Sequence, residues 1–399
     1  MANELSPNEL MAHVRALADD IGPRPAGTPR EAQAQAYVNR VLRQAGFEAI
    51  ETIPFRAPRT WGYALILPVA LALVGNFLLG RMGRLMGGLL SLYGLRSAHD
   101  AMVGRRTALA GLAPVGPSAT QVVRVPCVQS PANPRQTLVF IGHVDANRHR
   151  LTFSPLLKHL LTTASLVGSV ALVTNAALQL ARAVLPRKAL RRAHRLSVLD
   201  VASVLGLLLA DEIGSWVDGA NDNATAVACT LGLAAYLHEN PLPHTEVWFA
   251  FTGAEEVGLL GTHALLDAHG DRLKDAYFVD FEMVGAGRLA YISRHSSFAW
   301  DGAYQPDADS VALAQAVSHA HPDWKVQSRD MVILEEVAAL RDRGYRGICL
   351  VGVGDDGYLV NWHQHSDTSA QIDPACLERA AQFGLAYAHR LDETTTDRN

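Results

Sequence analysis

Cysteine and basic charge are scarce in this chain, and each scarcity excludes a class of protein. Four cysteines occur in 399 residues, far apart and without a CxxC pair, which excludes a dense disulfide scaffold and predicts core positions for them. Lysine and arginine total 35 against 39 acidic residues, and the formal net charge of −4 leaves no basic excess to bind nucleic acid. Only 19% of the residues are charged while 49% are apolar, which excludes an intrinsically disordered chain.

The beginning of the chain does not have the pattern of a cleavable signal peptide, because the stretch MANELSPNEL is polar. The spacing of the cysteines does not require an oxidising compartment either. We therefore expect the protein to be cytoplasmic or membrane-associated.

Four apolar runs account for the high mean hydropathy of +0.08. Residues 60–80 and residues 160–181 contain no charged side chain, and each run is long enough to cross a hydrocarbon layer of about 30 Å. Residues 85–95 and 196–210 are short for a membrane span, so we expect these two to be tilted, re-entrant or buried.

Two interpretations of the apolar runs stay open. In the first, residues 60–97 and 156–210 contact a membrane, and the six basic residues between 182 and 195 form a solvated or lipid-facing loop. In the second, the helices pack on each other as a lid over the active site or as a contact within a homo-oligomer. Long apolar runs fit both interpretations.

Outside the apolar runs, short strands alternate with amphipathic helices. The expected strands are at 47–53, from 122, and at 136–142, 246–252, 276–281 and 347–353. This alternation predicts an α/β fold with a mixed, mostly parallel central sheet and helices on both faces. Ligands of such sheets bind beyond the carboxyl ends of the strands.

Histidines and acidic residues follow the expected strand ends or lie in the loops after them. They are His143 with Asp145, Asp222, Glu255 with Glu256, Glu282, and His363. Oxygen and imidazole ligands without thiolates suit zinc or another divalent ion that keeps an open coordination position for catalysis. The sequence therefore predicts a metal site at one edge of the sheet.

A site for two metal ions needs one bridging carboxylate, a nitrogen and a carboxylate for each ion, and a further group that moves a proton. The neighbouring Glu255 and Glu256 are able to divide the last two tasks, one toward a metal and one toward water. Asp145 stands two residues after His143, where we expect it to accept the second imidazole N–H and fix the tautomer.

The motifs together resemble those of the co-catalytic zinc aminopeptidases, a family that includes bacterial leucyl aminopeptidases and is related to glutamate carboxypeptidase and glutaminyl cyclase. The matching segments are His143-Val144-Asp145, Asn221-Asp222-Asn223, residues 249–261, Glu282-Met283-Val284-Gly285, and His363 with Asp367-Thr368. Residues 8–57, with Gly22-Pro23-Arg24-Pro25, are similar to the N-terminal part of that family.

The resemblance implies a role for each residue. It implies that His143 and Glu282 hold one zinc ion, that Glu256 and His363 hold a second, that Asp222 bridges the two, and that Glu255 is the general base and acid. The family more often has aspartate where Glu282 stands, which is a carboxylate shorter by one methylene. His365 competes with His363 as a ligand, although the step from His363 to Asp367 fits the family better.

The resemblance further implies a fold like that of zinc exopeptidases. The expected organisation is a single zinc-peptidase domain over residues 1–399, with apolar helical insertions at 58–105 and 151–214, the second carrying the basic loop. The expected function is a metal-dependent exopeptidase that hydrolyses the N-terminal peptide bond of peptides with a free amino terminus. Two alternatives stay open: an aminoacyl transferase with a single zinc, like the glutaminyl cyclases, and a binding or assembly protein without catalysis.

Overall fold

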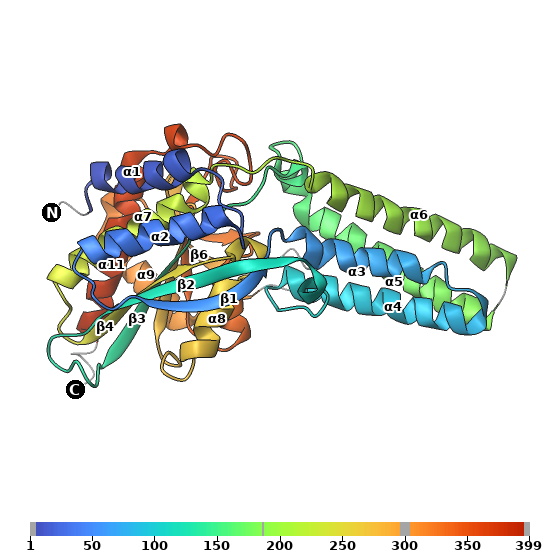
Figure 1. Cartoon of the computed structure of the whole chain (residues 1–399), viewed down its shortest axis with the longest axis horizontal. Helices are drawn as coiled ribbons and strands as arrows, with labels where there is room; N and C mark the ends of the chain where they lie inside the picture. The colour runs from blue at the N-terminus through green and yellow to red at the C-terminus, as the bar shows by residue number, and fades with distance from the viewer. Residues whose placement is uncertain (1–4, 186, 296–303, 395–399) are drawn as a thin grey trace.

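The computed structural model describes residues 5–185, 187–295 and 304–394. It shows a layered α/β body built on one eight-stranded sheet, from one end of which a bundle of four helices projects (Figure 1). The sheet is mixed, with the strand order β1-β2-β4-β3-β5-β8-β6-β7. The predicted α/β fold with helices on both faces of a mixed sheet is therefore confirmed.

The strands are β1 (Glu51–Pro58), β2 (Val115–Val125), β3 (Gln136–His143), β4 (Thr245–Thr252), β5 (Tyr277–Glu282), β6 (Arg288–His295), β7 (Gln327–Met331) and β8 (Ile348–Val353). The helices of the α/β body are α1 (Pro7–Arg15), α2 (Pro29–Gln44), α7 (Thr225–Glu239), α8 (Leu260–His269), α9 (Ala308–Ala320), α10 (Glu336–Asp342) and α11 (Pro374–Thr394). The helices of the bundle are α3 (Gly62–Gly75), α4 (Gly80–Met102), α5 (Leu161–Val184) and α6 (Lys188–Asp211).

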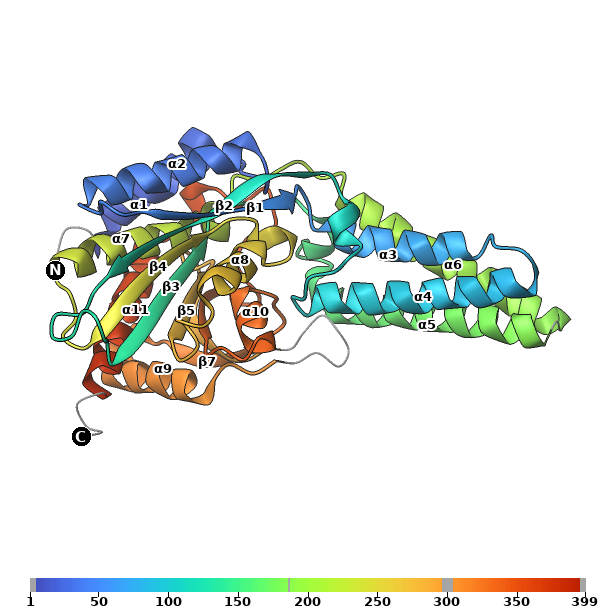
Figure 2. The ribbon, with the colours of Figure 1, turned by 60° about the horizontal axis from the view of Figure 1, so that its bottom comes forward.

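Two apolar cores cover the two faces of the sheet. On one face α1, α2, α7 and α11 pack over the sheet, and on the other face α8 and α10 do so (Figure 2). Phe140, Phe249 and Phe281 on three neighbouring strands point to the first face, where Phe140 stacks on each of the other two with ring centroids 5.7 Å apart. All four cysteines are buried and none forms a disulfide, as their spacing predicts.

The central strands run in parallel and place their carboxyl ends at one edge. β3 pairs in parallel with β4 on one side and with β5 on the other, so that His143 lies opposite Thr252 across the first pair. Glu282 is the last residue of β5 and lies at the same edge. The topology therefore brings His143, Glu282 and the loop after β4 together.

One strand is displaced from its expected position. Residues 47–53 alternate in sequence, but β1 runs over Glu51–Pro58. The reason is that Phe47 turns inward, where its ring lies 4.4 Å from that of His238 and joins the core beneath α7.

The four inserted helices form a closed bundle. α3 packs on α4, α4 on α5, α5 on α6, and α6 again on α3. The chain enters and leaves the bundle at the end near the sheet, and the α3–α4 connection, the end of α5 and the start of α6 lie at the far tip (Figures 1 and 2).

Three helix lengths in the bundle differ from the expectation. The run 60–80 is not one span, because α3 ends at Gly75, where the Asn76 side chain donates to the carbonyls of Ala72 and Leu73. The run at 196–210 is not short, because the basic residues before it continue the same helix and α6 reaches 24 residues. In the same way α4 extends well beyond residues 85–95 and reaches 23 residues. The apolar runs alone therefore do not give the helix bounds, because a helix ends at a cap inside a run or continues through polar residues beyond it.

Candidate metal centre

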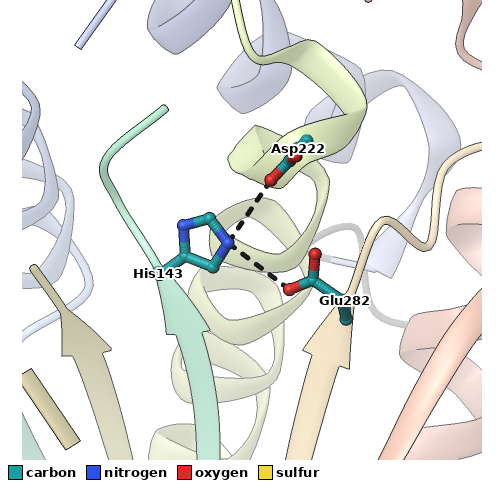
Figure 3. Close-up of side chains that lie close together, drawn as sticks. All are labelled: His143, Asp222 and Glu282. Carbon is teal, nitrogen blue, oxygen red and sulfur yellow. Dashed lines mark ion pairs between the residues drawn. The ribbon is translucent and has the colours of Figure 1, made fainter. Parts of the chain in front are cut away.

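Three side chains from separate elements meet at the carboxyl edge of the sheet (Figure 3). His143 ends β3, Glu282 ends β5, and Asp222 lies in the turn before α7. The Nε2 atom of His143 is 3.4 Å from Asp222 Oδ1 and 3.4 Å from Glu282 Oε2. This trio matches the first ligand set that the resemblance implies.

A second trio shares Asp222 with the first. The Nε2 atom of His363 is 3.3 Å from Asp222 Oδ2 and 3.2 Å from Glu256 Oε2. The two oxygens of Asp222 thus face different histidines, and within each trio the ligand atoms lie within 4.8 Å of one another. This is the arrangement expected of a carboxylate that bridges two cations.

The unsatisfied atoms at this edge fit a metal ion. His143 is fully buried, yet its Nε2 has no hydrogen-bond partner, and neither has Glu256 Oε1. Buried polar atoms are normally hydrogen-bonded, so an orphaned ligand atom in each trio indicates a missing partner of another kind. A set of carboxylate and imidazole donors without thiolate suits zinc.

The charge balance of the site also favours bound cations. Burial raises the pKa of Glu282 to about 8 and raises the pKa of Glu255 well above its usual range. Burial also opposes ionisation of Asp222, but the nearby imidazoles of His143 and His363 outweigh burial and lower the pKa of Asp222. If all four acidic side chains around the two imidazoles were ionised, negative charge would be in excess, and divalent cations would stabilise these ionised forms.

Asp145 acts on the Glu255-Glu256 loop more directly than on His143. Its carboxylate accepts the backbone N–H groups of Glu255, at 3.0 Å, and of Glu256, at 3.2 Å. The Nδ1 atom of His143 lies 3.2 Å from the backbone carbonyl oxygen of Asp145 and 3.5 Å from its carboxylate. Asp145 therefore touches both the imidazole and the loop, and the carbonyl is the nearer partner of the imidazole.

Arg24 is a supporting residue to which the sequence reasoning gave no role. It is fully buried, and its guanidinium donates to five carbonyls, among them those of Val144 at 2.9 Å and Gly219 at 2.8 Å. It thereby fixes the loops that follow His143 and precede Asp222. An arginine inside the segment Gly22-Pro23-Arg24-Pro25 was the available signal.

Two asparagines and one aspartate complete the support. Asn223 donates to Glu282 Oε2 at 2.8 Å, and Asp367 accepts the backbone N–H groups of Asn221 and Asp222 at 2.6 and 3.1 Å. Asn147 donates to Glu256 Oε2 at 2.6 Å. The motif around residue 222 pointed to Asn223, whereas no local pattern singles out Asn147.

His365 does not join the site. Its exposed ring stacks on His149 with centroids 4.3 Å apart, and it belongs to no ligand cluster among the described residues. Trp362 borders the small pocket over the centre, a space of about 50 Å³. Tyr358 does not line this pocket, and its ring lies against the ammonium group of Lys158.

Comparison with known proteins finds a peptidase family and aminopeptidase relatives. Residues 200–388 match the sequence profile of peptidase family M28. A curated relative named probable lipoprotein aminopeptidase LpqL, from Mycobacterium tuberculosis, is 27% identical over 194 residues, which cover 43% of this chain and 39% of the relative. The match thus spans well under half of that relative's length.

Solved structures share the fold at low sequence identity. A zinc aminopeptidase from Bacillus subtilis aligns over 97% of this chain and 95% of its own, with a TM-score of 0.59 and 12% identity. A glutaminyl cyclase from an Acidobacteriales bacterium aligns over 98% and 95%, with a TM-score of 0.55 and 15% identity. The resemblance to the zinc aminopeptidases is therefore confirmed, because residues 200–388 match peptidase family M28 and the chain shares the fold of a zinc aminopeptidase.

Proposed function

We propose that the protein is a zinc exopeptidase that hydrolyses the N-terminal peptide bond of its substrate at a dinuclear centre. The observation that carries this proposal is Asp222, whose two carboxylate oxygens face His143 and His363 separately. His143 with Glu282 would hold one zinc ion, and His363 with Glu256 the other. The bound ions would polarise the peptide carbonyl and activate water for attack.

Glu255 is the general base and acid in this proposal. Its carboxylate lines the pocket over the centre and lies 3.7 Å from His143 Nε2, yet neither half of the ligand set needs it. Burial raises the pKa of Glu255 above its usual range, so its carboxylate is a stronger base toward water, and the acid formed by that proton transfer is able to protonate the leaving amine. Asp145 holds the backbone of Glu255 in place for this transfer.

The second candidate is a cyclase with a single zinc ion, because glutaminyl cyclases share the fold. Cyclisation needs one ligand trio, whereas this chain has two complete trios that share one carboxylate. The presence of His363 and Glu256 beside Asp222 favours the dinuclear hydrolase.

The test combines a count of bound zinc ions with the substitution of Glu255 and a matched substitution of Glu256. We expect two zinc ions per chain by mass spectrometry, and cleavage of aminoacyl p-nitroanilides that a chelator abolishes. Glu255→Gln should keep both ions and lose about 10³-fold in kcat. The matched variant Glu256→Gln should lose one ion as well as activity. One zinc ion in the wild type, or normal turnover in Glu255→Gln, would contradict the proposal.

A membrane is the second partner that we propose, at the outer surface of the four-helix bundle. Most exposed large apolar side chains of the described chain lie there, including Leu79, Met82, Val170, Val173 and Leu199. α5, with the short turn before it, and α6 are long and apolar enough to span a membrane, yet only 28% and 17% of their apolar windows are buried. A core helix of a soluble protein would be mostly buried.

The interior of the bundle contains a cluster of polar side chains beside its small apolar core. Asn175 is fully buried and hydrogen-bonds to Ser91 and Ser197 at 3.1 Å and to Gln179 at 2.9 Å. Close packing of small residues accompanies it, because a Cβ on Gly87 would lie 2.2 Å from the Gly75 carbonyl oxygen. Polar and small residues between helices are typical of helix packing in membranes.

The dimensions and charges of the bundle fit a bilayer. Helices of 23 or 24 residues are about 35 Å long, and a hydrocarbon layer is about 30 Å thick. Basic residues of the segment 182–195 and Arg81 lie at the far tip, which the positive-inside tendency would place on the cytoplasmic side. Asp200, exposed in the middle of α6, opposes insertion of that helix.

A further inference from the structure

A cavity of about 450 Å³ lies among all four bundle helices, at the end nearest the sheet. Its volume is in the range of sites that bind small organic ligands. Apolar side chains from each helix form most of the wall, as in Leu65, Val69, Leu95, Leu172, Val204 and Leu208. The helices thus enclose an apolar space at the base of the bundle.

This cavity adjoins the metal centre. Trp61, Arg150 and Phe153 line both the cavity and the pocket over the ligands. That pocket measures only about 50 Å³, so a large group attached close to the scissile bond does not fit within it. The shared wall leads such a group toward the bundle.

The charged residues at the base of the cavity are already paired. Arg150 donates to Glu212 Oε1 at 2.8 Å, and Asp211 accepts the backbone N–H of Thr152 at 3.0 Å. Arg150 also donates to Asn147, which donates to the ligand Glu256. Because no unpaired charge faces the cavity among these residues, it suits an uncharged apolar chain.

The cavity also reaches the outer surface of the bundle. Val167 on α5 and Leu207 on α6 line it, and they are 59% and 39% exposed. A chain that is dissolved in the surrounding hydrocarbon would therefore enter between α5 and α6, with its polar end directed to the metal centre.

We propose that the cavity binds an unbranched aliphatic chain of the substrate, attached within a few atoms of the scissile amide. The substrate class is then an amphiphile, namely an amino-acid or peptide amide that carries an alkyl or acyl chain. This inference rests on the proposed hydrolase function. The apolar walls select for chain length, and the metal centre acts on the amide.

The test is a series of leucine n-alkylamides, from methyl to octyl, with the full-length protein in lipid nanodiscs. Each methylene that enters the cavity should raise kcat/KM by about fourfold, the equivalent of ~0.8 kcal/mol, until the cavity is filled. Binding of the same amides to the Glu255→Gln variant, measured by titration calorimetry, should tighten at least 100-fold from methyl to octyl. Calorimetry reports on the cavity without requiring turnover.

Two glycines provide a matched pair of variants. A Cβ on Gly168, which lines the cavity, would lie 3.7 Å from Val204 Cγ1, so Gly168→Leu projects a side chain across the space. A Cβ on Gly206, on the exposed side of α6, would meet nothing within 4 Å. Gly168→Leu should reduce the octyl-to-methyl ratio at least tenfold, whereas Gly206→Leu should leave that ratio unchanged.

The outcomes separate the two proposals. Cleavage of all amides at one rate, together with equal binding, would overturn the chain site and leave the hydrolase intact. No cleavage of any amide, with binding that still tightens with chain length, would overturn the hydrolase alone. A phospholipid retained in native mass spectrometry, with a flat amide series, would show that the cavity holds a structural lipid and would overturn the substrate assignment.

Discussion

The α/β body and the four-helix bundle differ in how many large apolar side chains they expose. In the body, the rings of Phe140, Phe249 and Phe281 are buried against the sheet. In the bundle, Asn175 and Gln179 are buried, and large apolar side chains cover the outside. The same chain therefore contains one part that buries its large apolar side chains and one part that exposes many of them, which is the basis of the proposed membrane contact.

Buried polar groups also have different roles in the α/β body and in the bundle. In the body, Arg24 and Asp145 fix backbone loops that carry the metal ligands. In the bundle, Asn175 joins helices to each other at a distance from the centre. We expect loss of a polar group to be costly in the first case and mild in the second.

The largest expected effect concerns the outside of the bundle. Replacing Val170 and Val173, exposed on α5, by arginine should cost about 6 kcal/mol of insertion free energy, since each arginine at the helix centre costs about 3. The protein should then leave the membrane fraction in carbonate extraction and flotation. The control is Val128→Arg, an equally exposed valine on the α/β body, which should not change the partition. Membrane retention of the double variant would contradict a lipid-facing α5.

The next effect concerns the buried arginine of the body. Arg24→Leu leaves five carbonyls without their donor and should lower the free energy of unfolding by about 4 kcal/mol. Urea unfolding of the α/β body, followed by tryptophan fluorescence, measures this change. Zinc content should fall as well, because the loops at Val144 and Gly219 lose their anchor.

Arg30 provides the matched control for that experiment. It is exposed and donates to one carbonyl, that of Ile21, so Arg30→Leu should change stability by less than about 0.5 kcal/mol. Equal effects of the two exchanges would mean that Arg24 does not hold the metal loops in place.

Much of the α/β fold was predictable because its signals are local. The apolar run before His143 and the alternation after Gly219 predict β3, β4, β5 and the helices between them, close to their observed bounds. The antiparallel placement of β2 beside β4 was not predictable, since strand pairing depends on contacts between distant segments.

The candidate ligands were singled out in sequence because each stands at a strand end or in a loop. Their mutual distances, and the separate orientation of the two Asp222 oxygens, depend on how β3, β5 and α7 pack. Supporting residues such as Asn147 were missed, because a side chain that acts through a contact 109 residues away has no local signature. The cavity was missed for the same reason, since four separate helices form it.

A smaller effect than that of Arg24 should follow from removal of the charge in α6. Asp200→Leu eliminates an exposed carboxylate at mid-helix and should favour insertion by about 3 kcal/mol. Membrane retention under carbonate extraction at high pH should increase. The same exchange at the exposed Asp323 of the body should have no effect on retention. A decrease for Asp200→Leu would indicate that Asp200 pairs with a polar partner and not with lipid.

The smallest effect is expected inside the bundle. Asn175→Leu removes hydrogen bonds to Ser91, Ser197 and Gln179. In membranes each such bond contributes only about 0.6 kcal/mol, and the leucine side chain regains some packing energy. The free energy of unfolding should therefore fall by about 1 kcal/mol. Titration with SDS in mixed micelles measures it, and Asn240→Leu at the exposed end of α7 should shift the midpoint by less. A loss of stability above about 3 kcal/mol would show that the polar cluster around Asn175 stabilises the bundle as strongly as Arg24 stabilises the α/β body, because losses of that size accompany broken buried networks.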